Sequence, residues 1–218
     1  MEFERLKARQ RAERERYPPN LGLRVHRALS WLGRAEQLVE DVDARFILLW
    51  IAFNAAYATE IDEKYRLSEQ ATFRAFLQKL VDLDAGRGRI AGLLWREFPG
   101  GIRVLLANPY VFQDFWNSHN GSLGPEEWKT RFAEANRAAQ VALARQDTVT
   151  VLGIVLSRIY TLRNQLMHGG ATWASAVNRD QLRDCTNFMG QLVPLVIEVM
   201  MDHPGTLWGD ACYPVVTA

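Results

Sequence analysis

The stretch ARFILLWIAFNAAYAT, residues 44–59, is apolar on almost every side when it is drawn as a helix. A helix without a polar face is stable mainly inside a protein, so we predict that it lies at the centre of the fold. Asp41 or Asp43, just before it, is a suitable N-cap. Within it, the polar residue Asn54 is either a core amide with its hydrogen bonds satisfied or a group that points into a functional cleft.

Helical patterns continue on both sides of this stretch. Apolar spacing predicts helices over about residues 23–39, 149–168 and 179–201, and no run alternates like a strand with hairpin turns. We therefore predict an all-α, up-and-down helical bundle with a four-helix core and an irregular helical insertion over about residues 61–146. Residues 1–20 are a predicted charged helical arm, either solvated or in contact with RNA or a partner, and residues 21–218 a single domain.

Composition narrows the class of protein. The chain has 218 residues and a formal net charge of +1, which excludes a grossly basic nucleic-acid coat but leaves room for a local basic cleft. The charged N-terminus has no apolar core, and the longest apolar run, FILLWIAF over residues 46–53, is too short to cross a bilayer. We expect a cytoplasmic protein without a membrane segment, in which Cys185 and Cys212 are reduced thiols.

The residues best suited to chemistry lie in LSRIYTLRNQLMHGG, residues 156–170. Arg163, Asn164 and His168 stand at the end of the predicted helix, and Gly169-Gly170 is a helix stop signal. On an ideal helix Asn164 and His168 are within roughly 40° of each other, whereas Arg163 is about 140° from His168. Fraying or a tight last turn must therefore help the long Arg163 side chain to reach around and converge with the other two.

These residue types meet the needs of RNA cleavage. Histidine accepts the proton of the attacking 2′-hydroxyl, arginine stabilises the charge that gathers on the phosphate oxygens, and asparagine orients either group. Arg158, further up the same helix, either extends the positive surface or pairs with an acidic residue of a neighbouring helix. Arg158 and Asn54 are the candidate substrate-binding residues. No histidine pair has metal-ligand spacing, so no metal or cofactor is expected.

RNQLMHG, residues 163–169, resembles the Arg-x4-6-His signature of the HEPN superfamily in the form where Asn follows the Arg and Gly follows the His. LLWIAFNAAY, residues 48–57, resembles a core helix of larger HEPN families. The resemblance covers about residues 23–59 and 148–201, and it leaves the insertion uncovered. It implies a four-helix core, a composite active site in a homodimer, and metal-independent cleavage of single-stranded RNA to 2′,3′-cyclic phosphate and 5′-hydroxyl ends.

The resemblance also implies biological roles, and other interpretations of the motif stay open. Such nucleases act as toxins or antiviral defence effectors, and family habit points to an antitoxin partner such as a nucleotidyltransferase-type protein. Because arginine and histidine favour helix C-termini in any case, the motif is alternatively a structural cap. Two further alternatives are a non-catalytic RNA- or nucleotide-binding module and a structural dimerisation domain.

Overall fold

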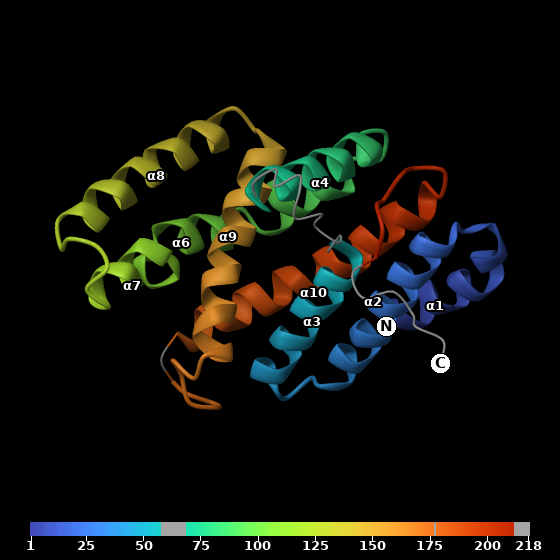
Figure 1. Ribbon diagram of the computed structural model, residues 1–218, viewed down its shortest axis with the longest axis horizontal. Coiled ribbons are helices and arrows are strands. Elements are labelled where there is room, and N and C mark those ends of the chain that lie inside the picture. The colour runs from blue at the N-terminus through green and yellow to red at the C-terminus, as the bar shows by residue number, and fades with distance from the viewer. Residues whose placement is uncertain (58–68, 177, 212–218) are drawn as a thin grey trace. The chain divides into compact units, whose positions relative to one another are not determined.

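The structure, a computed structural model, describes residues 1–57, 69–176 and 178–211 (Figure 1). These residues form α-helices with short 3-10 and π-helical segments and contain no β-strand, which confirms the predicted all-α helical bundle. The chain divides into two compact units, residues 1–87 with 186–218 and residues 88–185. The second unit therefore joins most of the predicted insertion to the helix that carries Arg163, a grouping that was not predicted from the sequence.

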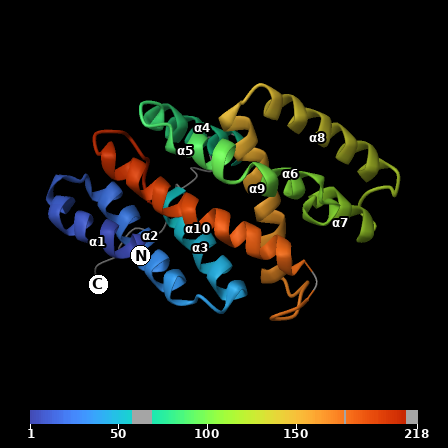
Figure 2. The same cartoon turned by 180° about the vertical axis from the view of Figure 1, so that it is seen from behind.

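The first unit is built around the apolar stretch of residues 44–59. Its elements are α1 (Glu2–Glu13), η1 (Arg14–Arg16), α2 (Pro19–Gln37), α3 (Val42–Tyr57), α4 (Glu69–Asp84) and the C-terminal part of α10 (Arg179–Asp202). The Asp41 Oδ1 atom accepts a hydrogen bond from the Ala44 amide at 3.0 Å, so Asp41 caps α3. Phe46 and Phe53 are at most 1% exposed, and α2, α3 and α10 lie side by side in both views (Figures 1 and 2).

A buried arginine links three segments of this unit by hydrogen bonds. Arg24 on α2 is 1% exposed, and its guanidinium donates to the carbonyl oxygens of Ala56 at 2.9 Å, Asp210 at 2.7 Å and Gly209 at 3.3 Å. Burying a cation is costly unless its donors find partners. Arg24 therefore holds the end of α3 and the chain after α10 against α2.

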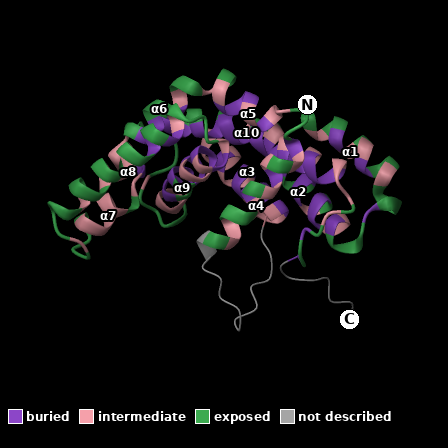
Figure 3. Cartoon of the chain, turned by 90° about the horizontal axis from the view of Figure 1, so that it is seen from above, coloured by how far each residue is buried: buried purple, intermediate pink, exposed green. Residues whose placement is uncertain are grey.

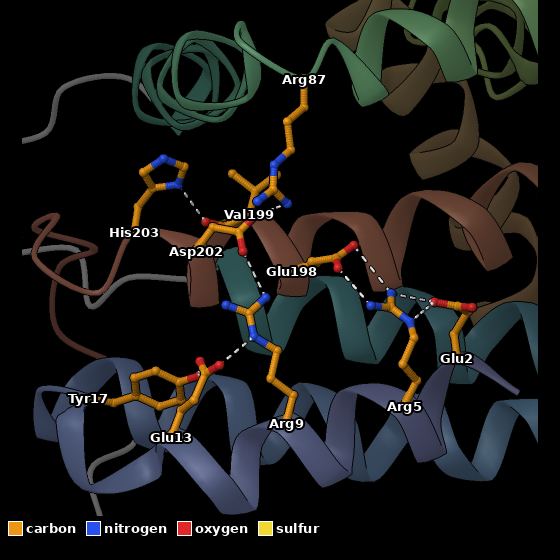
Figure 4. Close-up of polar contacts among 10 residues, drawn as sticks. All are labelled: Glu2, Arg5, Arg9, Glu13, Tyr17, Arg87, Glu198, Val199, Asp202 and His203. Atoms are coloured by element: carbon orange, nitrogen blue, oxygen red, sulfur yellow. Dashed lines mark hydrogen bonds and ion pairs between the residues drawn. The ribbon is translucent and has the colours of Figure 1, made fainter.

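The N-terminal arm is a packed helix of the first unit. Leu6 and Gln10 of α1 are buried, and two arginines on α1 form ion pairs with α10: Arg5 with Glu198 at 2.7 Å and Arg9 with Asp202 at 2.8 Å (Figure 4). Asp202 also pairs with Arg87 at 3.1 Å. The alternating charges of the arm thus face α10 as well as solvent.

The second unit contains α5 (Arg89–Gly92), η3 (Leu93–Glu97), α6 (Pro99–Ala107), η4 (Pro109–Val111), α7 (Gln113–His119), α8 (Glu127–Ala144), α9 (Thr148–Met167) and the first turns of α10. Asp147 caps α9, accepting from the Thr150 amide at 3.0 Å. Phe98 both ends η3, as its C-cap, and precedes α6, which begins at Pro99 because a proline in the first helical turn loses no hydrogen bond through its missing N–H.

Burial differs sharply between the helices. α10 is largely buried and α3 carries only buried and half-buried residues, whereas α7 and α8 carry mainly exposed and half-buried residues (Figure 3). Within the described part of the chain, none of the helices is both long and apolar enough to cross a membrane.

Candidate functional site

The end of α9 is fixed by its backbone. Gly169 has φ +71°, its amide donates to Leu166 at 3.3 Å, and the Gly170 amide donates to Gln165 at 2.7 Å. This pair of bonds is the Schellman arrangement, in which a left-handed residue just past the helix satisfies the last carbonyls. His168 is the C-cap residue, and its own amide donates to Asn164 at 3.0 Å. The predicted Gly-Gly stop is therefore confirmed.

The guanidinium of Arg163 is turned toward the side of the helix that carries Asn164. Its Nη1 donates to Asn164 Oδ1 at 2.9 Å, and its Cζ lies 6.0 Å from the centre of the Tyr160 ring. Asn164 therefore positions the arginine, and the Tyr160 ring flanks it from the preceding turn. The convergence of Arg163 with His168 stays a prediction.

His168 is exposed, and its imidazole forms no hydrogen bond or ion pair with a described residue. The helix end is capped by backbone bonds of Gly169 and Gly170, so the cap does not use the imidazole. Two other histidines do have local partners: the Nδ1 of His119 bonds to the Phe115 carbonyl at 2.8 Å, and that of His203 to the Val199 carbonyl at 3.0 Å. The ring of His168 is therefore available to an external group.

Arg158 lies inside the second unit. Its side chain is on the inward face of α9, the residue is 4% exposed, and its guanidinium lies 4.4 Å from the Phe112 ring and 5.6 Å from the Phe132 ring. No described carboxylate pairs with it, and its Nε is buried without an acceptor. Burial lowers the pKa of Arg158 to about 10. The arginine thus neither extends an exposed positive surface nor forms the ion pair given as its alternative.

Asn54 is half-buried on α3, in the first compact unit, whereas Arg163, Asn164 and His168 belong to the second. Its amide forms no hydrogen bond with a described residue, so the core-amide alternative, which required satisfied bonds, receives no support. Its predicted contact with substrate stays a prediction. Cys185 is a buried free thiol, and burial raises its pKa to about 12, whereas Cys212 lies outside the described residues.

The site at the end of α9 therefore consists of an exposed imidazole, a guanidinium oriented by an amide, and a rigid glycine cap. No protein-family model, curated protein or solved structure matches the chain. The chemistry of the site is therefore argued from its own residues alone. In the described ranges, no group of three or more His, Cys, Asp or Glu side chains is placed to hold a metal ion.

The apolar side chains that surround the motif were not predicted from the sequence. Tyr160 is 47%, Met167 52% and Trp173 75% exposed. Tyr160 and Met167 are seven residues apart, so with Asn164 between them they form one stripe of α9. Two features of the sequence could have predicted this apolar surface. One is the helical spacing of Tyr160 and Met167 from Asn164, and the other is the lack of any Asp or Glu between residues 148 and 179.

Proposed function

We propose that the chain is a metal-independent endoribonuclease whose reaction takes place at the exposed end of α9. The observation that carries this proposal is the imidazole of His168, exposed and without a protein partner among the described residues, on the same helix end as a guanidinium that Asn164 holds in place. An arginine fork oriented in advance is the group best suited to a phosphate, because two parallel N–H donors match two phosphate oxygens.

The proposed reaction is a transesterification. His168 accepts the proton of the ribose 2′-hydroxyl, the 2′-oxygen forms a bond to phosphorus, and the bond from phosphorus to the 5′-oxygen breaks. Arg163 stabilises the negative charge on the non-bridging oxygens. The leaving 5′-oxygen takes up a proton, so the products are a 2′,3′-cyclic phosphate and a 5′-hydroxyl. In the homodimer that we propose, a second copy of the chain supplies the acid through its own imidazole.

The test compares the parent protein with His168→Ala and Arg163→Ala on single-stranded RNA in the presence of EDTA. We expect the parent to cleave and each variant to lose roughly a hundredfold or more of the rate, the usual contribution of a proton-transferring or charge-stabilising group. The 5′ ends of the products should accept phosphate from a polynucleotide kinase without prior dephosphorylation. His26→Ala, which removes an exposed histidine of the first unit, is the matched control and should cleave like the parent.

Two results would contradict the proposal. Activity that disappears with EDTA and returns with a divalent cation would indicate a different mechanism. RNA that is bound by the parent, released by Arg163→Ala and never cut would favour a binding module in place of a nuclease.

A further inference from the structure

The loop after α9 presents the most exposed aromatic side chain among the described residues. Trp173 is 75% exposed, although an indole ordinarily buries most of its surface. It lies five residues after His168, a span of at most about 17 Å of extended chain. This span places the indole within a few nucleotides of the candidate site.

The turn that carries Trp173 is held by hydrogen bonds. The Ser175 amide donates to the Thr172 carbonyl at 3.1 Å, which makes residues 172–175 a β-turn with Trp173 at its first corner. Ala174 takes φ +55° at the second corner, and the Arg179 Nε donates to the Ser175 carbonyl at 3.0 Å. A corner residue projects away from the turn, which accounts for the exposure of the indole.

The charges around this loop select the kind of ligand. Residues 148–179 contain Arg158, Arg163, His168 and Arg179 but no Asp or Glu. Of these cations only Arg158 is buried. The next carboxylate, Asp180, is paired with Arg183 at 3.3 Å. A projecting indole among basic side chains suits a polyanion that carries flat rings, and single-stranded nucleic acid is the biological polymer with both properties.

We infer that Trp173 stacks against a base of the RNA strand, near the phosphodiester that His168 and Arg163 act on. This inference rests on the proposed function and adds a substrate-binding residue to it. Stacking on an indole is tolerant of sequence, because every base has a flat face. The proposed contact therefore gives affinity for unpaired strands without a preference for one base.

The test separates binding from cleavage. Affinity is measured in the His168→Ala background, which does not cut, with a short oligouridine RNA and with a matched oligomer that lacks its bases. We expect Trp173→Ala to raise Kd for oligouridine about tenfold, in the range that base stacking contributes. It should leave Kd for the baseless oligomer unchanged, and Trp173→Phe should retain most of the affinity. In cleavage assays Trp173→Ala should raise KM and change kcat far less.

Trp31→Ala is the control, because it removes a 40% exposed indole of the first unit. An unchanged Kd for oligouridine in Trp173→Ala overturns the inference, as does an equal loss for the two oligomers. Sedimentation showing that Trp173→Ala dissociates a dimer would assign the indole to a protein interface. If the parent shows indole-dependent RNA binding without cleavage, the proposed nuclease fails and the stacking contact stands. Cleavage that is indifferent to Trp173 overturns the stacking contact and leaves the proposed nuclease in place.

Discussion

At the scale of single residues, two arginines of α9 have opposite environments although they are only five positions apart. Arg163 is half-buried and bonded to Asn164, whereas Arg158 is 4% exposed and lies on aromatic faces. The flat rings of Phe112 and Phe132 attract the buried guanidinium, by about 0.5–2 kcal/mol in typical cases. Desolvation opposes this attraction, and the lowered pKa of Arg158 is its signature.

Arg158→Met tests which effect is larger. Methionine keeps a long unbranched chain between the two rings and removes a buried charge that has no carboxylate partner among the described residues. We expect the free energy of unfolding to rise by about 0.5–1 kcal/mol, since replacing buried ionic groups by apolar ones of similar volume is often stabilising. Denaturant unfolding measures this free energy. The control is Arg103→Met at an exposed position, which should change the free energy of unfolding by less than about 0.5 kcal/mol. Weaker RNA binding by a folded Arg158→Met would support its predicted role in binding substrate.

At the scale of elements, the glycine after His168 decides how α9 ends. Gly169 has φ +71°, a conformation that costs an L-residue about 1–2 kcal/mol, and no atom stands within 4 Å of where a Cβ would be. Glycine is therefore favoured at position 169 by its backbone conformation and not by a lack of space for a side chain. The same cap fixes the direction in which the chain leaves the candidate site.

Gly169→Ala should lower the free energy of unfolding by about 1–2 kcal/mol, because alanine is strained in the left-handed conformation of this cap. It should also reduce RNA cleavage, because the cap holds His168. Gly22→Ala is a matched change inside α2, where a Cβ also meets nothing and φ is helical. It should stabilise the protein by about 0.5–1 kcal/mol. Thermal unfolding of both variants measures the contrast, and equal shifts would contradict the Schellman cap.

The contact of α1 with α10 depends on ionised carboxylates. Glu13 accepts from Arg9 at 2.9 Å and from the Tyr17 hydroxyl at 2.8 Å, and Arg9 in turn reaches Asp202 (Figure 4). The bond from Arg9 is the main reason that the pKa of Glu13 is below its ordinary value. A carboxylate with a lowered pKa in the folded state stabilises the fold above its unfolded pKa and loses that contribution as the pH falls.

We therefore expect the unfolding temperature to fall as the pH drops from about 5 to about 3, partly because Glu13 is protonated. Glu13→Gln should be slightly less stable at neutral pH and should show a shallower decrease over this range. Calorimetry across the pH range measures both effects. Glu15→Gln, at a far more exposed position, is the control, and identical slopes for Glu13→Gln and the parent would contradict the assignment.

At the scale of the whole molecule, a net charge of +1 provides no general attraction for nucleic acid. The electrostatic part of any affinity for RNA at the candidate site must come from the few basic side chains near the end of α9, namely Arg163, His168 and Arg179. Single strands release about 0.7 counterions per phosphate contacted, so two or three contacts give a modest dependence on salt.

In His168→Ala, which does not cut RNA and retains two of these basic groups, the logarithm of the RNA association constant should therefore fall against the logarithm of salt concentration with a slope of about −1.4. Fluorescence titrations of His168→Ala with oligouridine at several salt concentrations measure it, and Arg163→Ala should reduce the slope by about 0.7. A slope steeper than about −5 would show that a broad basic surface binds the RNA.

Local sequence was sufficient to predict most of the helices and several of their ends, since periodicity, caps and stop signals act between residues close along the chain. Asp41, one of the two predicted caps of α3, begins that helix, and Gly169 ends α9 where the local rules placed the stop. Tertiary packing alone determined which face of each helix is covered: Arg158 turned inward onto Phe112 and Phe132, α1 packed on α10, and Trp173 remained exposed. The physical reason is that burial depends on distant segments that cover a face, and helical spacing carries no information about which segments those are.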